Sequence, residues 1–344
     1  MRSLIVYLQS ALKSGASPTC SCPSYLKGKH GALNPQHDYI QGVFMKPLIT
    51  VERLCLASHI LSLVFGLAGL LLVLPNPAFI GILPPFGQTL FGWSMIGGGV
   101  VYILLGTATV AIYAYRMLGW QNWLGFMLPA VVLSLCSELL GTSTGIPFGH
   151  YQYLSGLGYK IGGLVPFTIP LSWFYMGMST YLLARVGLEA KGVNGWVKQL
   201  GAIALGALLL TAWDFVLDPA MSQTPYPFWE FQDLGQFFGM PYRNLSGWLG
   251  TGALFMSVAA LFWRTPSTQL IRNQLRVPLF IYLVNFAFGA IITMSQLGSR
   301  FWIPTAISVL LGVVPAVVLW WAAKPTAVVP PSSSSPTVAA LSKV

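Results

Sequence analysis

Long apolar segments follow one another along most of this 344-residue chain. A helix needs about 20 apolar residues to cross a hydrocarbon core of ~30 Å. Eight segments approach this length: Leu54–Leu74, Gly97–Ala114, Asn122–Leu140, Val165–Val186, Val197–Leu217, Gly247–Trp263, Val277–Leu297 and Trp302–Trp321. Because a backbone inside lipid must satisfy its own hydrogen bonds, these segments predict an all-α, polytopic integral membrane helix bundle.

The composition argues against a soluble protein and against a nucleic-acid partner. Only 8% of the residues are charged and 55% are hydrophobic, and the mean hydropathy is +0.69. A soluble surface needs about a quarter of charged residues. The net charge of +10 comes from Lys and Arg that flank the apolar segments instead of forming a patch. Such flanking charges are typical of membrane topology signals.

The positive residues also indicate an orientation. With the N-terminus in the cytoplasm, most of them lie on the cytoplasmic side, and only Lys160, Arg243 and Arg300 lie opposite. Cytoplasmic loops carry an excess of Lys and Arg, so both termini are predicted to be cytoplasmic. The uncharged stretch Ala78–Met95 is interrupted by a Pro-Pro pair, and we expect it to be interfacial or re-entrant instead of a ninth span.

The two ends of the chain are predicted to be tails. Residues 1–48 contain no long apolar run and are expected to form a flexible N-terminal tail, with Met45 as an alternative start of the protein. Residues 49–323 are the predicted transmembrane domain. Residues 324–344 are rich in Pro and Ser and are predicted to be disordered.

Three of the eight acidic residues lie within or at the ends of apolar segments, namely Glu138, Asp214 and Asp218. A carboxylate at mid-membrane costs up to ~2.5–3.5 kcal/mol, so it usually has a function or a partner; the alternative is a helix end that reaches interfacial water. The two aspartates are spaced i and i+4 and share one helix face. The predicted topology places all three carboxyls at the extracytoplasmic end, beside the polar loops Gly141–Gly163 and Pro219–Ser246. We therefore expect a site at this end.

Four segments around these residues resemble the membrane carotenoid hydratase family of cyanobacteria and haloarchaea. They are SELLGTSTGIPFG at 137–149, YQY at 151–153, WDFVLDP at 213–219 and GMPYRNLSGW at 239–248. The likeness runs from about Met45 to the last apolar segment. It implies a hydro-lyase that adds water across the terminal 1',2' double bond of an acyclic ψ-end carotenoid, such as γ-carotene, to give a tertiary alcohol. It also implies a plasma or thylakoid membrane location, and a downstream carotenoid glycosyltransferase as partner.

The residue chemistry agrees with this resemblance. Hydration of a trisubstituted alkene needs a proton donor and then capture of a tertiary cation by water. A carboxyl keeps its proton at neutral pH when burial or a like charge favours the neutral form. We predict that Asp214 or Asp218 is the donor and that the other, or Glu138, assists the attacking water as a base. This chemistry requires no cofactor.

The predicted substrate-binding residues are polar or aromatic side chains from the same regions: Thr142, Tyr151, Tyr175, Trp213, Trp229, Tyr242, Asn244 and Trp248. Aromatic faces can stabilise a cation, as expected here for Trp213, Tyr175 or Trp229. The Cys and His residues form no cluster with the spacing of metal ligands, so no metal site is predicted.

Three alternatives stay open at this point. One is another carotenoid enzyme with similar proton chemistry, such as a cyclase or an isomerase. The second is a proton-coupled transporter, since intramembrane carboxyls also serve as proton relays. Against it, these acids cluster at one end instead of crossing the membrane. The third is a non-catalytic pigment-binding or assembly protein.

Overall fold

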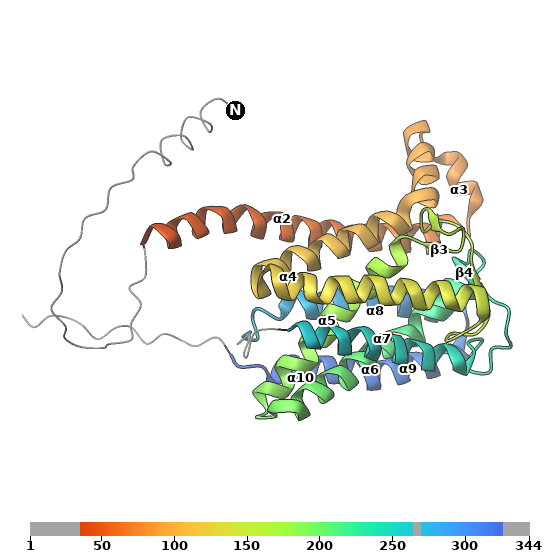
Figure 1. Ribbon diagram of the computed structural model, residues 1–344. Helices are drawn as coiled ribbons and strands as arrows, with labels where there is room; N and C mark the ends of the chain where they lie inside the picture. Colours follow the sequence, from red (N-terminus) through yellow and green to blue (C-terminus); the bar gives the residue numbers. More distant parts are fainter. Residues whose placement is uncertain (1–34, 264–269, 326–344) are drawn as a thin grey trace, which may run out of the picture. The chain divides into compact units, whose positions relative to one another are not determined.

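The computed structural model describes residues 35–263 and 270–325, and within them the chain is mainly helical and contains no closed sheet (Figure 1). The helices are α2 (Pro35–Ala68), α3 (Pro77–Ile82), α4 (Pro85–Thr144), α5 (Thr168–Ala190), α6 (Gly195–Ser222), α7 (Tyr242–Phe262), α8 (Arg276–Gln296), α9 (Trp302–Ser308) and α10 (Val314–Ala322). Short π and 3-10 turns adjoin them: η1 (Gly69–Val73), η2 (Ser299–Phe301) and η3 (Val309–Val313). The predicted all-α class is confirmed.

Six helical stretches of the described chain are long and apolar enough to cross a membrane. They are Lys46–Val73, Pro85–Thr144, Gly195–Ser222, Tyr242–Phe262, Arg276–Gln296 and Ser299–Ala322. The second contains both predicted segments 97–114 and 122–140. Its backbone leaves the helical region at Gly119, with φ 78° and ψ 164°, and the chain turns back there (Figure 1). The total of eight spans and the cytoplasmic termini stay predictions.

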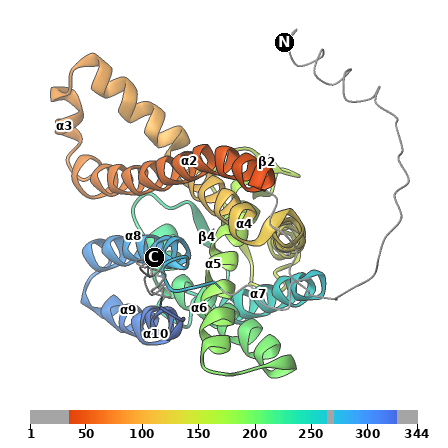
Figure 2. The ribbon, with the colours of Figure 1, turned by 90° about the vertical axis from the view of Figure 1, so that its left-hand side faces the viewer.

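Helix α5 is the central helix and is not among these six. It contacts α4, α6, α7, α8 and α10, and Figure 2, which looks along the helices, shows it among its neighbours. Every residue from Trp173 to Gly187 is buried. A helix covered on all sides faces protein instead of lipid. Six of the 23 residues of α5 are Ser, Thr or Tyr, a higher proportion than in the other long helices, and protein neighbours can satisfy their hydroxyls.

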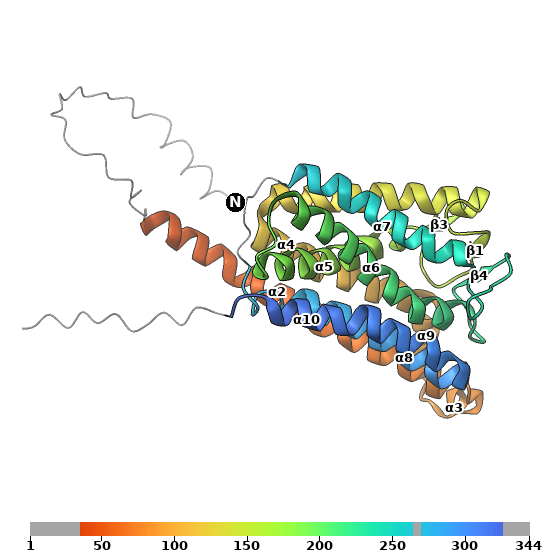
Figure 3. The ribbon, with the colours of Figure 1, turned by 90° about the horizontal axis from the view of Figure 1, so that it is seen from below.

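Two polar loops fold against each other at one end of the bundle. The loop after α4 contains β1 (Tyr151–Tyr153), β2 (Lys160–Ile161) and β3 (Val165–Pro166), and the loop after α6 contains β4 (Trp229–Phe231). β1 pairs antiparallel with β4, and β2 with β3. Figure 3 shows β1 and β4 beside the end of α6 and the start of α7. We call this the strand end of the bundle.

The N-terminal domain boundary expected at residue 49 stays a prediction. Helix α2 begins at Pro35, before the domain start expected at residue 49, and from Phe44 onward it belongs to the same compact unit as the later helices. The remaining parts of both predicted tails, 1–34 and 326–344, lie outside the described residues. The stretch 78–95 is divided between α3 and α4 at Leu83 and Pro84, where the backbone of both residues is extended and Pro84 has no N–H to donate. Its interfacial or re-entrant position stays a prediction.

Candidate functional site

A small chamber lies beneath the paired loops at the strand end. Its volume is about 40 Å³, which is room for at least one water molecule. Its walls come from α4, β1, α5, α6, β4, α7 and the loop before β1: Glu138, Phe148, Tyr151, Tyr153, Ile169, Ser172, Trp173, Leu217, Asp218, Trp229, Phe231, Asn244 and Trp248. Two carboxyls, one amide and several aromatic rings therefore surround a space large enough for a water molecule.

One wall is built around Glu138, near the C-terminal end of α4. Its Oε2 accepts hydrogen bonds from the hydroxyls of Tyr151 and Tyr153, the latter at 2.8 Å. Its Oε1 accepts one from the indole N–H of Trp173 at 2.9 Å. All three partners are neutral donors, so the buried carboxyl is fixed in position without a cation.

The two tyrosines belong to strand β1, outside the helices. Residues Tyr151 and Tyr153 alternate with Gln152, so both face the chamber while Gln152 faces away and bonds Glu230. Burial, followed by the charge of Glu138, raises the pKa of both phenols well above the ordinary value of about 10. Both hydroxyls therefore keep their protons and remain donors to Glu138 at neutral pH.

The second polar wall is built around two aspartates on α6. Asp214 and Asp218 are one turn apart and only 0% and 2% exposed. The amide of Asn244 bridges them, since its Nδ2 donates to Asp214 Oδ2 at 3.0 Å and also to Asp218 Oδ2. Trp229 Nε1 donates to Asp218 Oδ1 at 3.0 Å. None of the ion pairs among the described residues includes either aspartate. Burying two unpaired negative charges is costly, and sharing a proton avoids this cost.

Stacked tryptophans line the space between the two polar walls. The rings of Trp173 and Trp248 stack with centroids 4.2 Å apart and planes 27° from parallel. Trp213 meets Trp248 edge-on, with centroids 6.0 Å apart. Aromatic faces attract a nearby cation, and the effect grows when water is excluded. The chamber can therefore stabilise positive charge that develops on a bound molecule.

The loop motif after α4 places one further ring against the chamber. Phe148 packs between α4 and α7 at positions where both helices carry glycine. A Cβ atom at Gly141 or Gly247 would lie 2.7 Å or 2.5 Å from this ring. The two glycines therefore permit the close approach of the loop to both helices.

Most of the predicted site residues come together here. Chamber walls include Glu138, Tyr151, Asp218, Trp229, Asn244 and Trp248, and two others, Asp214 and Trp213, contact wall residues from behind. The convergence of the three carboxyls is the main expectation that the geometry supports. Thr142, Tyr175 and Tyr242 lie elsewhere.

Tyr175 belongs to a separate buried polar cluster between the helices. Its hydroxyl donates to Asn285 Oδ1 at 3.0 Å, and Asn285 Nδ2 lies 3.1 Å from His59 Nε2. The residue is two positions beyond Trp173 on α5, which turns its side chain to another face of the helix. Tyr175 therefore does not line the chamber, and its role in substrate binding stays a prediction.

Two other predicted residues also lie away from the chamber. The hydroxyl of Thr142 donates to the backbone carbonyl of Glu138 within its own helix, at 2.8 Å. Tyr242, at the start of α7, is 60% exposed. Neither side chain lines the chamber, and the substrate-binding roles of both stay predictions.

The sequence analysis left Trp173 and Tyr153 out of the candidate site. Tyr153 follows Tyr151 by two positions, and the period of a strand would have placed both on one face. Trp173 lies on a helix that is buried all round, so no amphipathic pattern indicates which of its residues face the site. Its role becomes visible only through its hydrogen bond to Glu138.

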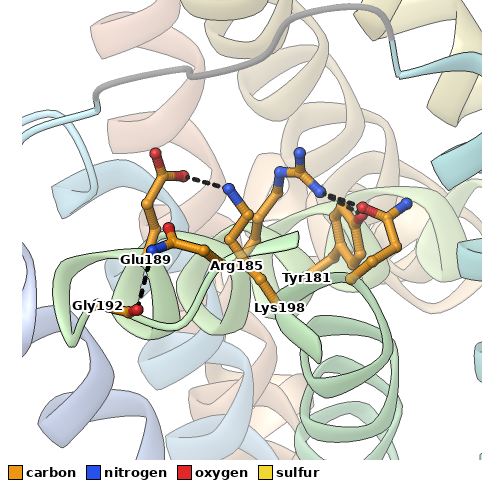
Figure 4. A network of polar contacts seen from close by, with 7 residues as sticks. Tyr181, Arg185, Glu189, Gly192 and Lys198 are labelled. Carbon is orange, nitrogen blue, oxygen red and sulfur yellow. Dashed lines mark hydrogen bonds and ion pairs between the residues drawn. The ribbon is translucent and has the colours of Figure 1, made fainter. Parts of the chain in front are cut away.

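A second polar network lies at the opposite end of α5 and α6, around the turn that joins them (Figure 4). We call this the turn end. Lys198 and Glu189 form an ion pair at 3.2 Å. Arg185 is buried, its Nη1 donates to the hydroxyl of Tyr181 at 3.2 Å, and its guanidinium lies 5.2 Å from the ring centroid of Trp263. Each charged side chain here has a carboxylate or an aromatic ring beside it.

Comparison with known proteins agrees with the motifs around the chamber. A family model described as carotenoid biosynthesis protein matches residues 98–315, which include every wall residue. Bisanhydrobacterioruberin hydratase from Haloarcula japonica is 33% identical over 201 residues, which cover 56% of this chain and 62% of the relative. The match thus spans less than two thirds of the relative's length, and no solved structure matches. The resemblance inferred from the motifs is confirmed, and this chain belongs to the carotenoid biosynthesis protein family.

Proposed function

We propose that this membrane protein is a carotenoid hydratase that adds water across the terminal 1',2' double bond of an acyclic ψ-end, as in γ-carotene. The observation that carries this proposal is the chamber, whose walls bring the buried carboxyls of Glu138 and Asp218 together with several indoles and no cation, while Asp214 adjoins Asp218 through Asn244. The hydratase activity named for the relative supports it. Addition of water changes no overall oxidation state, so the reaction needs no redox cofactor.

The first step requires an acid close to the alkene. A proton from the aspartate pair passes to the less substituted carbon, and the π electrons form the new C–H bond. The other alkene carbon becomes a tertiary cation. The indole faces of Trp229 and Trp248 border the space where this charge develops. A positioned acid of this kind typically contributes about 10²–10⁴ in rate.

The second step requires a water molecule and a base. Water adds to the cation through its oxygen and then releases one proton to a carboxylate. If the aspartate pair takes this proton, the starting acid is restored directly. Glu138 is the alternative base, and its three donors fix its orientation toward the chamber. If Glu138 takes the proton, that proton must then return to the aspartate pair before the next turnover. The substrate gains one water molecule in either case.

Analysis of pigments from a host that accumulates γ-carotene or lycopene tests this function. Expression of the chain should give a carotenoid heavier by one water, and its oxygen should come from isotope-labelled water. A ring-bearing product of unchanged mass would indicate a cyclase instead. An unchanged pigment profile, with the protein present in the membrane, would favour transport or pigment binding.

The position of the site relative to the membrane has its own test. We propose that the strand end is extracytoplasmic, as the distribution of Lys and Arg predicts. Reporter fusions after Lys160 and after Asp233 should then be exported, and a fusion after Lys191 should remain cytoplasmic. A cytoplasmic signal at Asp233 would contradict this orientation.

A further inference from the structure

The two aspartates differ in their access to the chamber. The carboxyl of Asp218 is part of the wall, together with Glu138 and Trp229, whereas Asp214 is not part of it. A general acid must come within hydrogen-bonding reach of the atom that receives its proton. An alkene placed in the chamber is therefore accessible to Asp218 and is screened from Asp214.

The contacts of Asp214 point to a supporting role. Its Oδ2 accepts a hydrogen bond from Asn244, and its Oδ1 has no partner among the described residues. A buried polar atom without a partner is uncommon and destabilising. Because Asn244 Nδ2 donates to Oδ2 of both Asp214 and Asp218, the two carboxyls are held beside each other. A proton on one of the two carboxyls reduces the repulsion between them, so the pair favours a form that can donate a proton.

We infer that Asp218 is the carboxyl that protonates the substrate, and that Asp214 is a positioning residue that favours a proton on Asp218 through its nearby carboxyl and the Asn244 bridge. This inference rests on the proposed hydratase function and assigns roles within it. It distinguishes two residues of the same type, on the same helix face, by access to the chamber.

Few other titratable groups bear on this pair. Besides the two aspartates themselves, Glu138 on α4 is the group of the described chain whose charge affects both carboxyls. Tyr151 and Tyr153 on β1 face the same chamber, and both stay protonated at neutral pH. Asn244 and Trp229, which touch the aspartates directly, do not titrate. The pH dependence of hydration should therefore respond to loss of either aspartate.

The test compares amide variants of the full chain in membranes, with γ-carotene as the substrate and hydration measured across pH. Asp218→Asn should lower the rate by at least about 10²-fold at every pH, since the donor is lost. Asp214→Asn should retain measurable hydration, with an optimum displaced to lower pH because the remaining carboxyl has no partner to share its proton. Asp214→Ser is a smaller second variant that should show the same displacement. Glu189→Gln, at the turn end, is the matched control.

The outcomes separate this inference from the proposed function. Absence of hydrated product from the wild-type protein would overturn the function itself. If the wild type is active and the Asp214 variants are as inactive as Asp218→Asn at every pH, or keep the wild-type pH optimum, the inference is wrong and the function stands. Thermal unfolding of each detergent-solubilised variant shows whether it is folded.

Discussion

The two ends of the α5–α6 hairpin bury polar groups in opposite ways. At the turn end, Lys198 pairs with Glu189, and the guanidinium of Arg185 lies over an aromatic ring. At the strand end, Glu138 and the aspartate pair are held by hydroxyl, indole and amide donors only. A charge that has an oppositely charged or aromatic partner contributes to helix packing, whereas a buried acid without a cation can take up and release a proton. Burial alone does not distinguish a structural polar group from a catalytic one; the charge of its partners does.

Acid-to-amide changes at both ends give the largest expected difference. Glu138→Gln removes the proton-carrying carboxyl and one of its two acceptor oxygens, so the hydroxyls of Tyr151 and Tyr153 must accept from the new NH₂ group instead of donating to a carboxylate. We expect hydration to fall by about 10²-fold or more and the unfolding free energy to drop by about 1–3 kcal/mol. Glu189→Gln should leave the hydration rate unchanged. Equal rates for the two variants, measured by product mass spectrometry, would remove the distinction between the ends.

Removal of the buried cation should affect stability without affecting chemistry. Arg185→Met loses the hydrogen bond to Tyr181 and the contact with Trp263, and we expect a loss of about 2–3 kcal/mol in unfolding free energy. Hydration per folded molecule should match the wild type. The exposed Lys191→Met is the control and should change neither quantity. A large fall in the rate of folded Arg185→Met would show that the turn end also serves catalysis.

Packing at the strand end provides the next comparison. Gly247→Ala would bring a methyl group within 2.5 Å of the Phe148 ring, and overpacking of this kind costs about 1–3 kcal/mol. The displaced ring should also disturb the chamber and lower the hydration rate. Gly250→Ala, on the same helix with open space around it, should be neutral in both thermal unfolding and rate. Similar behaviour of the two variants would contradict the close packing of the loop.

The smallest effect is expected at the outer clamp between the two loops. His150 donates its backbone N–H to Asp233 Oδ2 at 2.9 Å, and its ring lies 3.1 Å from Oδ1. These bonds, the backbone bond first, lower the pKa of Asp233 below its ordinary value. The clamp therefore stabilises the fold above about pH 4, the ordinary carboxyl pKa, and its contribution is lost as pH falls further.

Thermal unfolding of the wild type and Asp233→Asn across pH checks this clamp. The two should differ by no more than about 1 kcal/mol at neutral pH, because the pair is largely exposed to solvent. The difference should vanish at acid pH, and hydration should persist in the variant. A difference that grows as pH falls would contradict the sign of the shift.

The helices and the convergence of the three carboxyls can be predicted from the sequence, but the side chains that line the chamber cannot. Apolar length and the i, i+4 spacing suffice to anticipate that Asp214 and Asp218 share a face near Glu138. The sequence indicates Tyr175 but not Trp173 as a site residue, because α5 is buried on every side and gives no amphipathic signal. The bridge by Asn244 depends on how the loop after α6 closes, and no local pattern encodes that closure.

The pairing of β1 with β4 also determines when the site comes into existence. Its clamp residues His150 and Asp233 are 83 positions apart, and α5 and α6 lie between them in the chain. Such long-range contacts form late, because a long loop must close before they are made. During synthesis, Glu138 emerges well before Trp229 and Asn244, so the chamber cannot assemble until α7 follows α6. Under the proposed function, the nascent chain has no working proton donor while its acidic residues enter the membrane, and catalytic competence belongs to the completed bundle.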